Sequence, residues 1–230
     1  MEIANDSPTK VSVLAAKLSI AASAIALLAL LSLHFLSPEF NPSWRVVSEY
    51  ALGQYPLMLS AFFLIWGLGS FFAAISVWPL ITGATGKAGL CLLFVSAIGG
   101  TMAAFFDVKH SMHGMAALLG VPTLPIAAML ISYSLVRKYH IQGKFLLLSA
   151  NFTWLILILM VIAMVVMLSG FAKAGLDISG NQQVSEKVPE GVIAVAGYTN
   201  RLLVFINILW LIVVSRQVIR FRKNDDRQEL

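Results

Sequence analysis

Six long apolar stretches determine what this chain can fold into. They lie at about residues 11–36, 56–81, 88–106, 115–136, 145–168 and 192–219. A helix needs roughly 20 mostly apolar residues to cross the ~30 Å hydrocarbon core of a bilayer, and each stretch is close to or above that length. Strands of a membrane barrel would alternate apolar and polar residues, which these continuous runs do not. The sequence therefore predicts an all-α, single-domain membrane bundle of six helices.

The composition supports this class of protein. Hydrophobic residues make up 59% of the 230 residues and charged residues only 12%, whereas about a quarter of a soluble domain is charged. The net charge of +5 does not indicate a nucleic-acid partner, because the basic residues gather at the ends of the apolar stretches. The single cysteine, Cys91, excludes an internal disulfide and a cysteine-rich metal site.

The basic residues also predict the orientation of the chain. Eleven of the 16 Lys and Arg residues lie on the side that holds the two termini, the loop near Lys87 and the loop at 137–144. Because cytoplasmic loops carry the excess of positive charge, both termini and the charged tail at 221–230 are expected in the cytoplasm. We therefore expect a multi-pass protein of the cell inner membrane, whose two long loops, 37–55 and 171–191, face outward.

Polar residues near the ends of the apolar stretches form a candidate ligand-binding site. Ser48 and Glu49 lie in the first outer loop, Asp107 and His113 flank the short loop after the third helix, and Arg201 lies about two turns inside the sixth. A cation within a membrane helix is unfavourable unless it reaches the interface or finds a partner. We expect Arg201 either to extend to the outer surface or to pair with Asp107 or Glu49. The alternative is that the first loop is only an interfacial connector.

Asp107, His110 and His113 suggest a second kind of chemistry. They are spaced three apart, which places them on neighbouring positions of one face if the turn is helical. A carboxylate and two imidazoles can bind zinc or transfer a proton near neutral pH. The spacing is short, however, and no second His or Cys cluster completes a site. We therefore expect no metal and no other cofactor, and a solvated polar turn is the alternative.

Small, kinking and amide residues within the stretches indicate how the helices pack. Pro122 and Pro125 are expected to kink the fourth helix, and the uncharged amides of Asn151 and Asn207 are candidates to bridge helices. The residues expected to permit close helix contact are Gly67, Gly69, Gly99 and Gly100.

Several short motifs resemble those of one protein family. They are His34-Phe35-Leu36-Ser37-Pro38, Asn41-Pro42, Val47 to Gly53, Phe106-Asp107, His113-Gly114 and Asn200-Arg201-Leu202. Together they are similar to the bacterial and archaeal membrane family known as domain of unknown function 998, and the resemblance runs from the first helix to the sixth. It implies a six-helix inner-membrane protein without a settled activity. The layout is also similar, at a distance, to eukaryotic six-helix glycolipid-anchor remodelling and autophagy-modulator proteins, which favours a lipid-facing role over ion transport.

The leading hypothesis is recognition of a membrane lipid or another amphipathic molecule at the outer leaflet. The five side chains of the candidate site would supply its polar contacts, with Arg201 holding an anionic headgroup or the neighbouring carboxylates. Nothing in the sequence calls for turnover, so an enzyme is not favoured. One alternative is a lipid hydrolase that uses Asp107, His110 and His113, and another is a structural or assembly partner whose polar cluster only holds the helices together.

Overall fold

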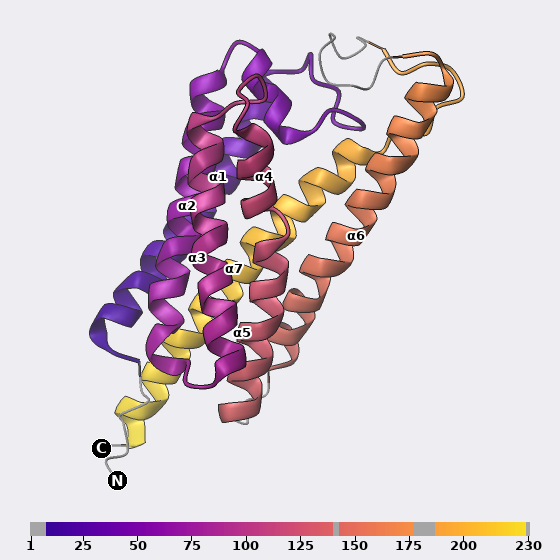
Figure 1. Cartoon of the computed structure of the whole chain (residues 1–230). Helices are drawn as coiled ribbons and strands as arrows, with labels where there is room; N and C mark the ends of the chain where they lie inside the picture. Colours follow the sequence, from indigo (N-terminus) through magenta and orange to yellow (C-terminus); the bar gives the residue numbers. More distant parts are fainter. Residues whose placement is uncertain (1–7, 140–142, 177–186, 229–230) are drawn as a thin grey trace.

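The computed structural model is a bundle of helices (Figure 1) and describes residues 8–139, 143–176 and 187–228. Its α-helices are α1 (Lys10–Leu36), α2 (Pro56–Val77), α3 (Ala84–Phe105), α4 (His113–Gly120), α5 (Thr123–Tyr139), α6 (Lys144–Lys173) and α7 (Ala196–Gln228). Two 3-10 helices, η1 (Val47–Leu52) and η2 (Trp78–Leu80), complete the described elements, which include no strand. Within these described ranges, six segments are long and apolar enough to cross a membrane, with α4 and α5 forming one of them. The predicted all-α membrane bundle with six spans is confirmed.

The last span is where the helix boundaries depart most from the predicted ones. It begins at Ala196 instead of near residue 192, after Gly191 adopts a positive φ of 80°. It also continues to Gln228, so the predicted tail at 221–230 is helical as far as it is described, and residues 229–230 lie outside the described residues. The later start places Arg201 nearer the first turn of the helix than the sequence suggested.

The fourth span is broken between α4 and α5, as its prolines predict. Because Pro122 has no N–H group, the helical hydrogen-bond ladder is interrupted at this point. Two side-chain hydroxyls donate to carbonyls near the break: Ser96 Oγ to Gly120 at 3.1 Å and Thr123 Oγ1 to Leu119. Neighbouring side chains that bond such carbonyls are what make a break acceptable within a membrane.

Helix α7 is the central element of the bundle and α6 the most peripheral. Half of the most apolar 18-residue stretch of α7 is buried inside the bundle, against 22% of the corresponding stretch of α6. Helix α7 contacts α1, α2, α5 and α6, whereas α6 packs mainly against α5 and α7. In Figure 1, α6 leans away from α4 as the two run toward the end of the bundle that carries the long loops.

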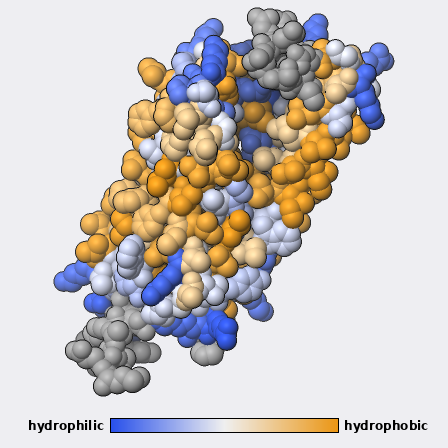
Figure 2. Space-filling model, viewed as in Figure 1, coloured by the Kyte–Doolittle hydropathy of each residue, from blue (hydrophilic) through white to orange (hydrophobic). Residues whose placement is uncertain are grey.

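The two ends of the bundle are distinct. Arg222 Nη1 donates to the carbonyl of Pro8 at 3.4 Å, so the first and last described segments meet at one end, here called the terminal end. The opposite loop end carries residues 37–55 and the start of α7. Figure 2 shows an apolar belt between two more polar ends, as a membrane-spanning bundle requires. The assignment of the terminal end to the cytoplasm stays a prediction from the basic residues.

Tight apolar packing fills the half of the bundle near the terminal end. One hydrophobic cluster joins residues of every α-helix except α4. Trp210 is fully buried there and donates from Nε1 to Ser132 Oγ at 3.0 Å. Gly89 lets α3 approach α5 so closely that an added Cβ would lie 2.9 Å from the Cβ of Leu130. Small residues and close backbones are the usual means of holding membrane helices together.

Candidate functional site

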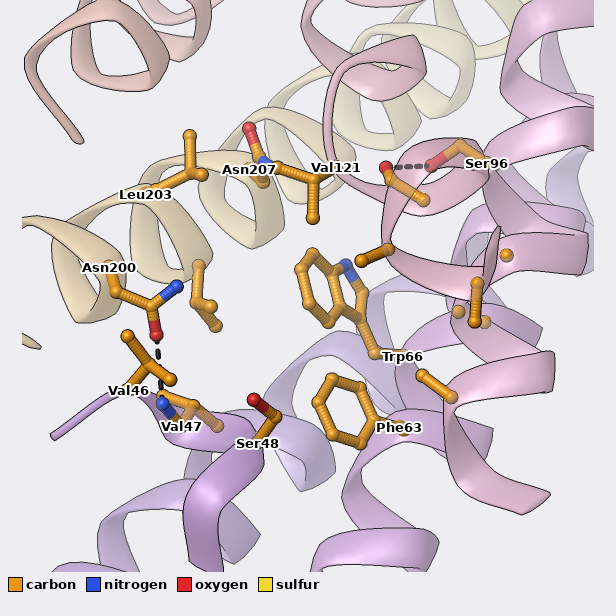
Figure 3. A pocket seen from close by; sticks show the side chains of 18 of the residues that line it. Val46, Val47, Ser48, Phe63, Trp66, Ser96, Val121, Asn200, Leu203 and Asn207 are labelled. Atoms are coloured by element: carbon orange, nitrogen blue, oxygen red, sulfur yellow. Dashed lines mark hydrogen bonds between the residues drawn. The ribbon is translucent and has the colours of Figure 1, made fainter. Parts of the chain in front are cut away.

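A cavity of about 230 Å³ lies in the half of the bundle near the loop end. It is bounded by η1, α2, α3, α4, α6 and α7, and Figure 3 shows it from close by. Its apolar walls include Val46, Val47, Phe63, Ala103, Ala116, Ala117, Val121, Met160, Met164, Leu203 and Val204. A cavity of about 150 Å³ with such walls stays dry and binds benzene in another protein. This one has room for part of an apolar ligand.

Small residues and the broken fourth span explain why the space exists. A side chain on Gly99 would collide with the backbone of Gly120, so α4 is held directly against α3. Gly100 similarly lies against Gly67 of α2, as an added Cβ would be 3.4 Å from its Cα. The prediction that these glycines permit close helix contact is confirmed. Helix α4 lies on α3 and has few contacts with α6 or α7. The space between α4 and α6 therefore stays open, and Figure 2 shows a hollow beside α6.

Polar side chains also line this cavity, among them Ser48, His113 and Asn200. Ser48 Oγ points toward the space (Figure 3) and has no hydrogen bond to any described residue. His113 Nδ1 lies 2.9 Å from the carbonyl oxygen of Phe106, so Nδ1 donates this hydrogen bond and Nε2 does not take part in it. Asn200 Oδ1 accepts from the Val47 N–H at 2.9 Å, which attaches η1 to α7.

Two further polar atoms in the cavity walls have no hydrogen-bond partner in the part of the chain that the structure describes. They are Trp66 Nε1 on α2 and Asn207 Oδ1 on α7, and Asn207 is only 1% exposed. Leaving such a group buried and unpaired costs about 1–3 kcal/mol. Asn207 thus does not bridge helices through this oxygen. Asn151 does bridge two helices as predicted, because its Nδ2 on α6 lies 3.4 Å from the Tyr133 hydroxyl on α5.

Arg201 binds neutral groups of the protein itself. Its Nε donates to His34 Nε2 at 2.7 Å and its Nη2 to the Tyr50 hydroxyl at 2.9 Å. Its Nη1 donates to the carbonyls of Pro42, Arg45 and Gly197. No ion pair joins Arg201 to Glu49 or Asp107, all of which are described, so the expected pairing was wrong. A membrane-facing cation needs partners, and here backbone carbonyls and an uncharged imidazole supply them.

Glu49 is likewise used within the first loop. Its Oε2 accepts from the Val46 N–H at 2.8 Å, which caps η1, and its Oε1 accepts from Arg45 Nη1 at 3.1 Å. Burial raises the pKa of the Glu49 carboxyl above its ordinary value, and the Arg45 guanidinium beside it opposes that rise. Arg45 in turn lies 4.3 Å from the Trp44 ring centroid. Glu49 and Arg201 therefore hold the loop in place behind the cavity.

Asp107 and His110 lie in an exposed turn away from this network. Asp107 Oδ1 accepts from the Lys109 N–H at 2.9 Å, and His110 Nδ1 accepts from the Met112 N–H at 3.1 Å. The His110 ring stacks on Phe106 at 4.5 Å between centroids. Among the described residues no three His, Cys, Asp or Glu side chains are grouped to hold a metal ion. The turn that carries Asp107 and His110 has the geometry of a solvated polar turn.

The structure thus brings two of the five candidate residues, Ser48 and His113, to one cavity. Glu49 of η1 and Arg201 of α7 do not line it, and Asp107 is exposed. Sequence reasoning missed Trp66, although one signal was available. Membrane tryptophans gather at the interfaces, and Trp66 stands near the middle of its apolar stretch.

The six long apolar spans define an integral multi-pass membrane protein. The chain belongs to the family described as protein of unknown function DUF998, whose sequence profile matches residues 20–217. The family resemblance of the motifs is confirmed, while the distant similarity to eukaryotic six-helix proteins stays a prediction. No curated protein and no solved structure matches the chain.

Proposed function

We propose that the protein recognises a membrane lipid or another amphipathic molecule in the cavity near the loop end. The observation that carries this proposal is an apolar cavity inside a membrane bundle, with a few polar side chains in its wall. Ligand sites typically combine such apolar walls with a small number of orienting polar groups. The walls suit a hydrocarbon chain, and Ser48 and His113 suit the polar part of the same molecule.

The arrangement of α4 and α6 supports entry from the side. The two helices diverge toward the loop end (Figure 1), and α6 exposes large apolar side chains along its length. A lipid chain can therefore reach the cavity without crossing water. With the orientation that the basic residues predict, this path opens to the outer leaflet of the inner membrane.

Recognition without turnover is favoured over a hydrolase by the partners of the candidate residues. Ser48 and His113 line one cavity but are not hydrogen-bonded to each other. A nucleophile and its base are expected within hydrogen-bond reach. The Asp107–His110–His113 hypothesis receives no support, because Asp107 and His110 bond their own turn.

A substitution that fills the cavity with a larger side chain tests the proposal. Ala117 lines the cavity, and Leu118, the next residue of α4, is 63% exposed on the outside of the bundle. We expect Ala117→Phe to lose a lipid that co-purifies with the wild type, while Leu118→Phe keeps it. Mass spectrometry of lipid extracted from the purified proteins provides the measurement. Identical lipid content in all three proteins would contradict binding in this cavity.

A second experiment tests on which side of the membrane the loop end, and with it the cavity, lies. In a Cys91→Ala background, Gln54→Cys at the loop end should react with an impermeant thiol reagent in sealed cells. Thr82→Cys at the terminal end should be protected, since both positions are exposed on their own end. The reverse result would move the proposed site to the cytoplasmic leaflet but leave the cavity as the binding site.

A further inference from the structure

We infer that the polar part of the ligand is uncharged and carries a hydroxyl group, as in a monoacylglycerol or a long-chain alcohol. This inference rests on the proposed function and narrows it to one chemical class. It replaces the anionic headgroup that the sequence suggested for Arg201. Three observations support it: the charge of the cavity, its unpaired polar atoms and its size.

The charge of the cavity argues against an anionic ligand. None of the residues that line it is Asp, Glu, Lys or Arg. Arg201 is not among them, and its Nε and Nη1 groups already donate to His34 and to loop carbonyls. A phosphate or carboxylate inside this cavity would be removed from water without a countercharge, which is strongly unfavourable.

The unpaired atoms indicate a group that both donates and accepts. An indole N–H such as that of Trp66 is only a donor, and an amide oxygen such as Asn207 Oδ1 is only an acceptor. A hydroxyl supplies an O–H and two lone pairs, so hydroxyl-bearing ligands can serve both, whereas an ester carbonyl can serve only Trp66. Both atoms are covered by neighbouring protein groups, so a rotation of the amide or the indole accompanies binding. Ser48 and His113 add a hydroxyl and an imidazole nitrogen in the same wall.

The size of the cavity favours a small headgroup. At about 230 Å³ it is smaller than the ~300–1,000 Å³ of most ligand pockets. A glycerol or alcohol headgroup with the start of one chain fits such a volume, and the remainder of the chain would leave between α4 and α6. A large headgroup with two chains would not fit inside.

Two matched lipids test the inference. Monooleoylglycerol and its phosphate ester share one acyl chain and differ in charge. With the protein in phosphatidylcholine nanodiscs, the ligand-induced rise in melting temperature reports affinity. We expect the Kd of monooleoylglycerol to be lower than that of the phosphate ester by a factor of about ten or more. Tighter binding of the phosphate ester would overturn the inference.

Two asparagines provide matched variants for the unpaired oxygen. Asn207→Leu removes an unpaired buried acceptor, so the empty protein should melt at an equal or higher temperature while its affinity for monooleoylglycerol falls about tenfold. Asn151 bonds Leu147 and Trp154, so Asn151→Leu should lower the melting temperature and leave the affinity unchanged. A stable Asn207→Leu protein with wild-type affinity would overturn the role of this oxygen.

The failure of the inference and that of the proposed function have different signatures. If both lipids bind equally and Ala117→Phe abolishes both, the cavity is a lipid site and only the uncharged class is wrong. If neither lipid binds and no lipid co-purifies with the wild type, both proposals fail.

Discussion

The two halves of the bundle are stabilised in different ways. Near the terminal end, side chains such as Trp210 and Leu211 are fully buried in one continuous apolar cluster. Near the loop end, the buried apolar residues divide into two clusters. Trp66 lines the cavity and packs against one of these and against the cluster of the terminal half, whereas Met164 lines the cavity and packs against the other. Lipid is as apolar as leucine, so membrane helices associate through close packing and hydrogen bonds. Where the helices diverge, hydrogen bonds must supply more of the stability.

The hydrogen bonds of the loop half come chiefly from the first loop. The Ser43 carbonyl accepts from the N–H of Gly197 at 2.9 Å and so satisfies one free donor at the start of α7. An added Cβ on Gly197 would lie 2.5 Å from the Pro42 oxygen, so the loop lies directly on the helix. Arg201 then joins this loop to α1 through His34. The loop is thus the part that holds the cavity half together.

This difference indicates how the bundle can keep a cavity. An empty cavity and two unpaired polar atoms reduce stability, and the tightly packed half compensates for that loss. Binding sites often depart from optimal packing because function requires it. The comparison therefore predicts that equal substitutions have unequal effects in the two halves.

The largest expected effect distinguishes the buried Trp210 of the packed half from the half-buried Trp66 beside the cavity. Trp210→Ala should lower the free energy of unfolding by about 3–5 kcal/mol, because it opens a void in the packed half. It also removes the donor to Ser132 Oγ. Trp66→Ala should cost clearly less, because Trp66 already borders an open space and its Nε1 is unpaired. Unfolding of both variants in one detergent gives the comparison, and equal losses would show that the halves are packed alike.

The next effect concerns the partners of Arg201. Arg201→Leu leaves several carbonyls and His34 without their donor, and should cost about 1–3 kcal/mol. In double-mutant cycles on unfolding, coupling to His34→Leu should be about 0.6–1.7 kcal/mol, between the average and the largest value from such cycles in a membrane protein. Coupling to the exposed Asp107→Asn should be indistinguishable from zero. If Asp107 coupled more strongly than His34, the carboxylate pairing expected from the sequence would be restored.

The sequence predicted the spans well because each depends on a local property. An apolar run of sufficient length crosses the membrane whatever its neighbours are, and the break at Pro122 follows from the missing N–H. The partners of Arg201 could not be predicted in the same way. They are loop carbonyls and His34, 167 residues away in sequence, and a search for opposite charges overlooks neutral acceptors. The glycines and prolines that draw α4 onto α3 are visible in the sequence, but the divergence of α4 from α6 that leaves the cavity open depends on the packing of the whole bundle.

The smallest expected effect concerns the Arg45–Glu49 ion pair of the loop half and the Arg222–Asp226 pair of the terminal half. Both join residues four apart, with side-chain exposures of 13% for each partner of the first pair and 33% and 53% for the second. Asp226→Asn should cost about 0.3–0.5 kcal/mol, as is usual for an exposed helical pair. Glu49→Gln should also be small at pH 7, below about 1 kcal/mol, because the lost pairing and the relief of a buried charge oppose each other.

The dependence on pH tests the environment of Glu49 more sharply than the size of its effect at pH 7. Burial raises the pKa of the Glu49 carboxyl above its ordinary value of 4.5, so the folded state keeps this proton at a higher pH than the unfolded state does. Between those two pKa values the folded state binds more protons, and the contribution of Glu49 to stability falls as the pH rises. The melting temperature of the wild type minus that of Glu49→Gln should therefore decrease as the pH increases from 4.5 and then level off. If the difference stays constant or grows with pH, the Arg45 guanidinium, and not burial in the first loop, has the larger effect on the pKa of the Glu49 carboxyl.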